Sequence, residues 1–319
     1  MDVGAKVNPQ NIPLKKFQNP RITADGKLRA VVGLKKLQML WINTGTLCNL
    51  SCANCYIESS PTNNRLAYIT TSEVRCYLDE IIEENLGTRE IGFTGGEPFM
   101  NPEFMEIVNL SLSRGFLTLV LTNGMKPMQK VGDELICLNE RYSDQLTVRL
   151  SLDHYESFYH EMERGSDTWS PALEGLSWLS QNNFKIRIAG RTFWKQTEAE
   201  LREGYAELFS HLHLKLDAWD PTHLVLFPEI DEDADVPEIS NECWGLLKVS
   251  PESMMCSSSR MVIKRHGLDT PTVVPCTLLP YDERFDLGST LASSNLPVPL
   301  NHPHCAKFCV LGGGSCGTT

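Results

Sequence analysis

The stretch from residue 37 to residue 230 alternates short apolar segments with longer amphipathic ones, and this alternation restricts the folds open to the chain. Apolar segments of strand length recur six times, and segments with helical spacing separate them. Strands that alternate with helices favour a parallel sheet joined by right-handed crossovers. The strands are expected at 37–42, 90–96, 117–124, 146–153, 185–191 and 223–229, and the helices at 70–87, 101–115, 127–140, 170–183 and 198–212.

The number of strands distinguishes two versions of such a fold. A closed barrel of this kind has eight strands, whereas six are expected here. We therefore predict an α/β fold that forms a partial, TIM-like (β/α)6 barrel. The first helix carries the clearest local signals: Thr70 as N-cap, Glu73 completing a capping box, and Gly87 as the stop.

Polar motifs follow the ends of the expected strands. Because the carboxyl ends of parallel strands meet at one edge of a sheet, we expect these motifs to lie close together there. The sequence thus predicts a functional site on this rim. The motifs are three cysteines at 48–55, T-G-G-E-P at 94–98, T-N-G at 122–124, S-L-D at 151–153 and G-R-T at 190–192.

Cys48, Cys52 and Cys55 stand in C-x3-C-x2-C spacing soon after the first strand. The amino terminus lacks the apolar core of a signal peptide, so we expect a cytoplasmic protein with reduced cysteines. In a reducing compartment, clustered cysteines indicate metal binding rather than disulfides. Three thiolates on one loop suit either an incomplete zinc site or a cubane iron–sulfur cluster with one iron left open.

The chain is expected to have four parts. An amino-terminal arm contains a hairpin turn at Asp25 and Gly26, and the last part is a small cysteine-rich domain. A segment with so little apolar material needs a staple, which here would be a metal centre. Cys76, Cys137 and Cys243 stand apart and are expected to be buried small apolar side chains. The parts are an arm (1–36), a partial barrel (37–230), an acidic linker (231–242) and the cysteine-rich domain (243–319).

The charge and hydropathy of the chain exclude two classes of partner. Its 29 basic and 40 acidic residues give a net charge of −11, which argues against nucleic acid and anionic lipid. A membrane-spanning helix needs about 18 consecutive apolar residues, and the sequence contains no such run. We therefore expect neither nucleic acid nor a membrane as a partner.

The cysteine spacing resembles that of the radical S-adenosylmethionine (SAM) superfamily, over about residues 37–230. By this resemblance the three cysteines bind a [4Fe-4S] cluster whose open iron is chelated by SAM. The T-G-G-E-P motif is similar to the family's glycine-rich motif, which implies that Gly95, Gly96 and Glu97 bind the methionyl amino group of SAM.

Two further segments carry the resemblance. "SLDHYESFYHEMERG" at 151–165 looks like a segment of peptide-modifying and protein-modifying members. It implies that Ser151 contacts the ribose or carboxylate of SAM and that Arg164 pairs with the carboxylate. The residue before the third cysteine is usually aromatic in the family and lies near the adenine, but here it is Asn54. An amide can bond an adenine edge, and the adjacent Tyr56 can cover part of this role.

The tail is similar to the SPASM or shortened twitch extensions that hold an auxiliary [4Fe-4S] cluster. Its cysteines number five from residue 256 onward, one more than a cubane uses. Three are expected as ligands and two compete for the fourth place. A zinc site in which His302 or His304 joins the cysteines remains the alternative. The three expected ligands are Cys256, Cys276 and Cys309, and the competing pair is Cys305 and Cys316.

The resemblance implies an oxidoreductase-type or maturase-type enzyme that cleaves SAM to methionine and a 5′-deoxyadenosyl radical, which takes hydrogen from a peptide or protein side chain. An electron donor such as flavodoxin or ferredoxin is implied as well. Residues 1–36 are too few for a module that captures a leader peptide, so a small-molecule dehydrogenase whose auxiliary cluster accepts the second electron is the alternative. A non-catalytic, metal-stabilised binding protein is the rival from another class.

The sequence does not single out a general base. Four carboxylate or imidazole side chains are possible proton acceptors by type, but their spacing does not favour one of them. These residues are Asp153, His154, Asp217 and Asp220.

Overall fold

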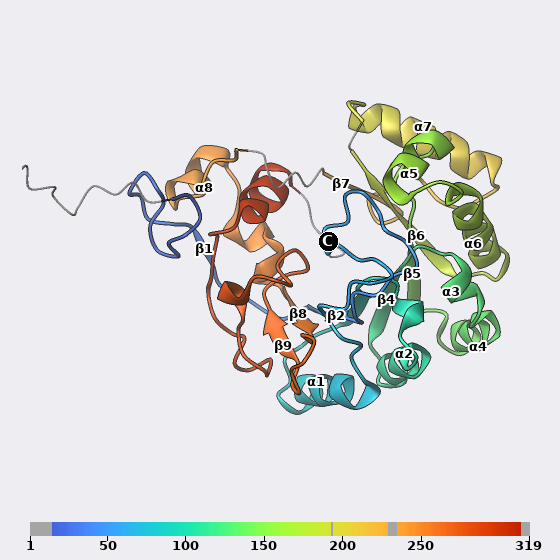
Figure 1. Cartoon of the computed structure of the whole chain (residues 1–319), viewed down its shortest axis with the longest axis horizontal. Helices are drawn as coiled ribbons and strands as arrows, with labels where there is room; N and C mark the ends of the chain where they lie inside the picture. Colours follow the sequence, from blue (N-terminus) through green and yellow to red (C-terminus); the bar gives the residue numbers. More distant parts are fainter. Residues whose placement is uncertain (1–14, 193, 229–234, 314–319) are drawn as a thin grey trace, which may run out of the picture.

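A computed structural model describes residues 15–192, 194–228 and 235–313 of the chain (Figure 1). Six strands run parallel to one another in sequence order, and each pairs with the next. The predicted parallel α/β sheet is therefore confirmed. The strands are β2 (Met39–Asn43), β3 (Glu90–Thr94), β4 (Leu117–Thr122), β5 (Leu146–Ser151), β6 (Lys185–Arg191) and β7 (Leu224–Phe227).

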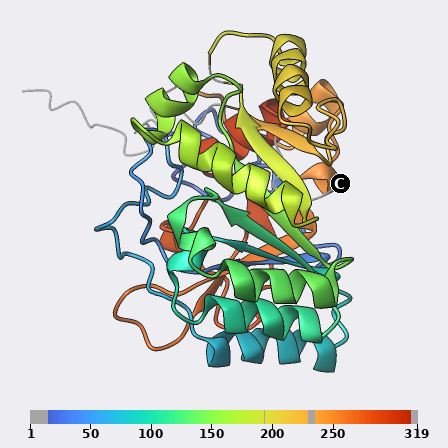
Figure 2. The same ribbon diagram turned by 90° about the vertical axis from the view of Figure 1, so that its right-hand side faces the viewer.

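The crossover helices lie on the outer face of this sheet, as Figures 1 and 2 show. Apolar side chains from the helices and from this face of the strands form one large core. The capping box of the first helix is present, with Thr70 and Glu73 bonded reciprocally. The helices are α1 (Thr71–Glu83), α2 (Phe104–Ser113), α3 (Lys126–Gln129), α4 (Gly132–Tyr142), α6 (Trp169–Gln181) and α7 (Glu198–His211).

Two helical segments differ from the expectation. The single helix expected at 127–140 is split into α3 and α4, because the backbone leaves the helical region at Val131. The helix α5 (Ser157–Arg164) was not expected. Its buried side chains are His160 and Glu163, whereas Phe158 and Met162 are exposed. The apolar side of this helix faces outward and its polar side is buried, which is the reverse of the usual pattern for a helix that packs on a sheet.

The tail adds two strands to the sheet, at the edge of β2 that does not pair with β3. The strand β8 (Ser259–Ile263) runs parallel to β2, and β9 (Thr272–Val274) pairs antiparallel with β8. Eight of the described strands thus form an open sheet in the order β7-β6-β5-β4-β3-β2-β8-β9. The partial barrel agrees with this open order. The division into four parts remains a prediction, and β8 hydrogen-bonds the cysteine-rich part directly to β2.

The amino-terminal arm packs against the tail. The strand β1 (Val31–Val32) pairs with β10 (Val298–Pro299), and an antiparallel bridge between Ile22 and Leu28 spans the expected hairpin turn. The tail has a second apolar core, which also includes side chains of the arm. Its other elements are α8 (Glu242–Leu247), the 3-10 helices η2 (Pro251–Ser253), η3 (Met255–Ser257) and η4 (Glu283–Phe285), and the π-helix η5 (Cys305–Leu311).

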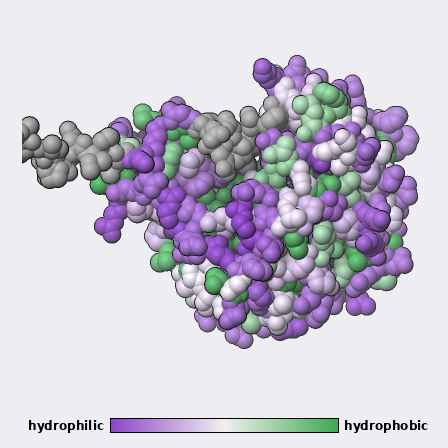
Figure 3. Space-filling model, in the orientation of Figure 1, coloured by the Kyte–Doolittle hydropathy of each residue, from purple (hydrophilic) through white to green (hydrophobic). Residues whose placement is uncertain are grey.

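The isolated cysteines and the surface complete the description. Cys76 and Cys137 are exposed and Cys243 is half-buried, so the expectation that these three are core residues was wrong. Both exposed thiols lie on the outward sides of helices, α1 and α4, where no apolar neighbour covers them. Hydrophilic residues predominate on the face shown in Figure 3. Among the described residues, no helix has the length and apolar character needed to span a bilayer.

Candidate cofactor site at the carboxyl ends of the strands

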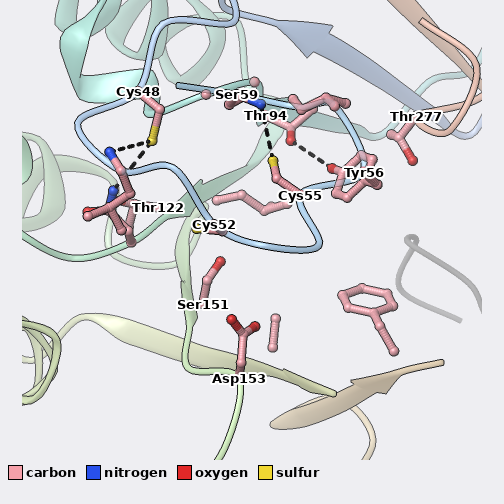
Figure 4. A pocket seen from close by; sticks show the side chains of 18 of the residues that line it. Cys48, Cys52, Cys55, Tyr56, Ser59, Thr94, Thr122, Ser151, Asp153 and Thr277 are labelled. Atoms are coloured by element: carbon pink, nitrogen blue, oxygen red, sulfur yellow. Dashed lines mark hydrogen bonds between the residues drawn. The ribbon is translucent and has the colours of Figure 1, made fainter. Parts of the chain in front are cut away.

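A cavity of about 140 Å³ lies at the carboxyl ends of β2 to β7, between the sheet and the tail (Figure 4). Motifs from five strands meet there, as the rim argument predicts. Asn54 and Glu97 are absent from the described residues that line it. The site residues expected from the sequence that do line it are Cys48, Cys52, Cys55, Tyr56, Gly95, Gly96, Ser151 and Arg164.

The glycine motif after β3 holds the start of the cysteine loop. The backbone nitrogen of Gly96 donates to the Gly45 carbonyl at 2.8 Å, and that of Glu97 donates to the Leu47 carbonyl at 3.1 Å. A Cβ added at Gly96 would lie 2.1 Å from the Leu47 carbonyl oxygen. Gly95 has φ +146°, and its Cβ would lie 2.5 Å from the Gly45 oxygen. The glycines therefore allow this loop to lie directly against the end of β3.

Backbone amides point at two of the three sulfur atoms. The Leu50 nitrogen donates to Cys48 Sγ at 3.4 Å, and the Ser59 nitrogen donates to Cys55 Sγ at 3.3 Å. Figure 4 shows both sulfur atoms among the side chains that line the cavity. N–H donors around sulfur suit thiolates that bind an iron–sulfur cluster, because hydrogen bonds to the sulfurs tune its potential. The donor set thus fits the cluster that the family resemblance implies.

Burial controls the ionisation of these thiols in the absence of metal. Desolvation raises the pKa of Cys48 to about 12 and raises that of Cys52. The neighbouring Arg164 acts in the opposite direction on Cys52. Both groups are thiols at neutral pH in the cluster-free protein, so metal binding must displace their protons.

Glu97 is fully buried behind the cavity, and its carboxylate accepts three hydrogen bonds. Oε1 accepts from Thr122 Oγ1 at 2.9 Å and from the Phe99 nitrogen at 3.2 Å, and Oε2 accepts from the Asn123 nitrogen at 2.9 Å. Desolvation raises its pKa to about 7, against the opposing effect of these donors. The carboxylate therefore ties the end of β3 to the end of β4. Its predicted contact with the SAM amino group remains a prediction.

The raised pKa of Glu97 predicts a pH dependence of stability in the cluster-free protein. Because the folded-state pKa lies above the ordinary value, the native state holds this proton while the unfolded state releases it. The free energy of unfolding should fall by up to about 3 kcal/mol between pH 4.5 and pH 7. Urea unfolding at several pH values measures this, and Glu97→Gln should flatten the slope. The same slope in Glu97→Gln would contradict the assignment, and Glu140→Gln, at an exposed position, is the control.

A buried ionic network lies beside the cysteine loop, at the ends of β5 and β6 and on α5. Arg164 donates to both oxygens of Asp153, through Nε at 2.7 Å and Nη2 at 3.2 Å. Arg191 lies 3.4 Å from Asp153 and 3.4 Å from Glu163. These guanidinium groups hold the pKa of Asp153 below its ordinary value despite burial. Asp153 therefore stays ionised and orients Arg164 toward the cavity wall.

Asn54 points to this network. Its side-chain nitrogen donates to Glu163 Oε2 at 2.8 Å, and its backbone nitrogen donates to Oε1 at 3.0 Å. Tyr56 lines the cavity, with its hydroxyl 3.4 Å from Thr94 Oγ1. Of the two residues considered for the adenine contact, Tyr56 is thus the one that lies at the cavity.

The possible proton acceptors are placed differently from one another. Asp153 lines the cavity but is engaged by Arg164. His154 is buried among aromatic rings and bonds Gln196 at 2.7 Å. Asp217 and Asp220 lie in the segment before β7, away from the lining residues. None of the four described residues is both at the cavity and unengaged, so the general base stays unassigned.

A second group of cysteines surrounds a small apolar cavity in the tail. Of the competing pair, Cys305 belongs to this group, and Cys316 lies outside the described residues. Cys305 and Cys309 stand on the π-helix η5. His304 lines the same cavity, whereas His302 is not among its described lining residues. The cysteines of the group are Cys256, Cys276, Cys305 and Cys309.

The arrangement of these thiols bears on the zinc alternative. In the described part of the chain, no three His, Cys, Asp or Glu side chains converge as ligands of a single metal ion. A cubane instead gives each thiolate an iron of its own, so its ligands need not meet at one point. Burial raises the pKa of Cys256 to about 11 and that of Cys305 to about 12. The cluster and the zinc ion therefore both stay predictions for this group of cysteines.

A buried arginine accompanies the second group. Arg260 on β8 is fully buried, and its guanidinium donates to backbone carbonyls, including that of Cys256 at 2.7 Å and that of Ser294 at 3.0 Å. Burial lowers its pKa, and the thiols of Cys256 and Cys276 oppose this effect. The positive charge of Arg260 would offset the negative charge that thiolates bring to this site.

One short segment separates the two groups of cysteines. Thr277 and Leu278 line the first cavity, while Cys276 and Leu278 line the second. The hydroxyl of Tyr281 donates to the Ile57 carbonyl at 2.6 Å, which ties this segment to the chain just after Cys55. The two sites are therefore in direct structural contact through residues 276–281.

Some residues of the site could not be recognised from the sequence. Glu163 looks like one acidic residue among several in "HEMERG", and Arg191 looks like an ordinary strand end. Their roles come from partners far along the chain, Asn54 above all. The place of Arg191 at the end of its strand, in the G-R-T motif, was the available signal.

A family model described as the radical SAM superfamily matches residues 42–207. The chain is 32% identical over 149 residues to the antilisterial bacteriocin subtilosin biosynthesis protein AlbA of Bacillus subtilis. It is 26% identical over 188 residues to the mycofactocin maturase MftC of Mycolicibacterium smegmatis. The matches cover 46% and 55% of this chain but 32% and 45% of the two relatives, which is less than half of either.

The fold is similar to that of solved structures. The crystal structure of Streptococcus suis SuiB bound to precursor peptide SuiA has a TM-score of 0.59 with this chain at 12% identity. The similarity covers 80% of this chain and 63% of that chain. At this level of identity it concerns the arrangement of helices and strands alone.

Proposed function

Because the chain belongs to the radical SAM superfamily, we propose that its first cavity binds a [4Fe-4S] cluster and SAM, and that it modifies a peptide or protein side chain. The observation that carries the proposal is the arrangement of Cys48, Cys52 and Cys55 around one cavity, with backbone N–H donors on two of the sulfurs. The cofactors of this superfamily are the cluster and SAM.

The proposal assigns a task to each side of the cavity. When bound, the cluster and SAM supply an electron and a 5′-deoxyadenosyl radical that abstracts hydrogen from the substrate. Gly95 and Gly96 keep the cysteine loop against β3, Arg164 provides a positive charge for a carboxylate, and Tyr56 offers a ring beside the loop. The apolar walls formed by Leu278, Phe227 and Phe308 exclude water from the substrate side.

The proposal extends to the tail and the partners. Cys256, Cys276, Cys305 and Cys309 would hold an auxiliary [4Fe-4S] cluster, which their common cavity supports. A peptide substrate is supported by the names of the relatives, one a bacteriocin biosynthesis protein and one a maturase. A flavodoxin or ferredoxin would supply electrons in the cytoplasm, where the thiols of Cys48, Cys52 and Cys55 stay reduced.

Anaerobic reconstitution tests the proposal. The protein should bind about eight irons per chain, four at each site. Addition of SAM and dithionite should release 5′-deoxyadenosine and methionine, measured by liquid chromatography. Four irons without SAM cleavage would overturn the proposal and favour the non-catalytic binding protein.

A further inference from the structure

The segment between Cys52 and Cys55 is fixed from one side by a single residue of α5, Glu163. Both carboxylate oxygens of Glu163 accept hydrogen bonds from Asn54, one from its backbone nitrogen and one from its side-chain nitrogen. The backbone nitrogen of Ala53 donates to the Glu163 carbonyl at 2.8 Å. Both residues between the two cysteines are therefore bonded to Glu163.

Arg191 at the end of β6 closes this arrangement. Its Nη2 donates to the Asn54 carbonyl at 3.0 Å, and its Nη1 lies 3.4 Å from Glu163 Oε1. The Glu163 side chain is 3% exposed and that of Arg191 is 13% exposed. Bonds to a buried carboxylate are strong, because its charge is stabilised by these partners and not by water. The Ala53–Asn54 segment is thus held in a defined position by these contacts.

We propose that Asn54 and Glu163 are positioning residues, which hold Cys52 and Cys55 at the separation that the cluster requires. The inference rests on the proposed function, because it assumes that these thiolates bind iron. Because both residues between Cys52 and Cys55 are hydrogen-bonded to Glu163, the two thiols can move little relative to each other. A metal site needs its ligands placed within a fraction of an ångström. A phenylalanine at position 54 has no polar atom in its side chain and could not donate the bond that Asn54 makes.

The substitution Asn54→Asp tests the positioning role with little change in size. The new carboxylate would face the Glu163 carboxylate where a hydrogen bond now lies, and like charges in a buried place repel. We expect reconstituted Asn54→Asp to lose most of the roughly four irons of the first site. The SAM-induced change in the electron paramagnetic resonance spectrum of the reduced cluster should disappear with them.

The paired variant Asn54→Asp, Glu163→Gln should restore both signals. The glutamine oxygen can accept from the backbone nitrogen of residue 54, and its amide can donate to the new aspartate, so the pair is rebuilt with donor and acceptor exchanged. The new carboxylate also keeps a negative charge beside Arg191. Asn64→Asp, at an exposed position of the same loop region, is the matched control and should bind iron as the unmodified chain does.

The outcomes separate this inference from the proposed function. If the unmodified chain binds no cluster at the first site, the proposed function fails. If the unmodified chain binds it and Asn54→Asp binds it equally well, the positioning role is wrong. If Asn54→Asp loses iron and the paired variant does not recover it, the loss does not come from the contact with Glu163, and the inference is overturned as well.

Discussion

Replacement of Gly96 by alanine is expected to abolish the first cluster and with it all SAM cleavage. The new Cβ would lie 2.1 Å from the Leu47 carbonyl oxygen and 2.8 Å from the Thr46 carbonyl oxygen. Both contacts are with backbone, so they can be relieved only if the loop that leads to Cys48 moves away from β3. Overpacking of this kind costs about 1–3 kcal/mol, and here the cost falls on the loop that carries the ligands.

Iron content and 5′-deoxyadenosine formation measure this effect. Gly96→Ala should bind about four irons, those of the second site, instead of about eight. Gly33→Ala is the matched control, because a Cβ at Gly33 meets no atom within 4 Å. Full iron content and SAM cleavage in Gly96→Ala would mean that the glycine motif does not position the cysteine loop.

Alanine substitutions in the two groups of cysteines should have opposite effects on SAM cleavage. Cys55→Ala removes a proposed ligand at the first cavity, and 5′-deoxyadenosine formation should fall to background while the second site keeps its iron. Cys276→Ala removes a proposed ligand at the second cavity, and SAM cleavage should continue while about four irons are lost.

The exposed Cys137 on α4 provides the control, since Cys137→Ala touches neither site. SAM cleavage by Cys55→Ala would show that the motif is not the cluster site. Loss of SAM cleavage in Cys276→Ala would show that the two sites do not act separately. The contact between the sites through residues 276–281 would then explain how a change at one affects the other.

The sequence predicted the parts of the fold that depend on local chemistry. The strand at 185–191 has the bounds expected for it, and Thr70 and Glu73 form the expected capping box. The common rim followed from the rule that parallel strands end together, and the cysteines, glycines and Arg164 do meet at one cavity. Hydrophobic periodicity and capping hydrogen bonds depend on residues that are close together in the sequence. Both can therefore be recognised from the sequence alone.

The features that were missed depend on partners distant in sequence. α5 buries His160 and Glu163, so the helix has a polar inner side whose reason is visible only beside the cysteine loop. The strand β8 looked like part of an irregular tail because its place was decided by the unpaired edge of β2. The direction of the Asn54 side chain depended on Glu163 in the same way.

The pairing of β8 with β2 also has a consequence for how the chain reaches its folded state. Met39 pairs with Ser259, so the edge of a fully buried strand near the start of the chain is covered by a strand made near its end. During synthesis β2 to β7 leave the ribosome first, and the apolar edge of β2 is open to other chains until β8 follows. A fragment that ends before residue 259 should therefore aggregate, and chaperone assistance would matter most in that interval.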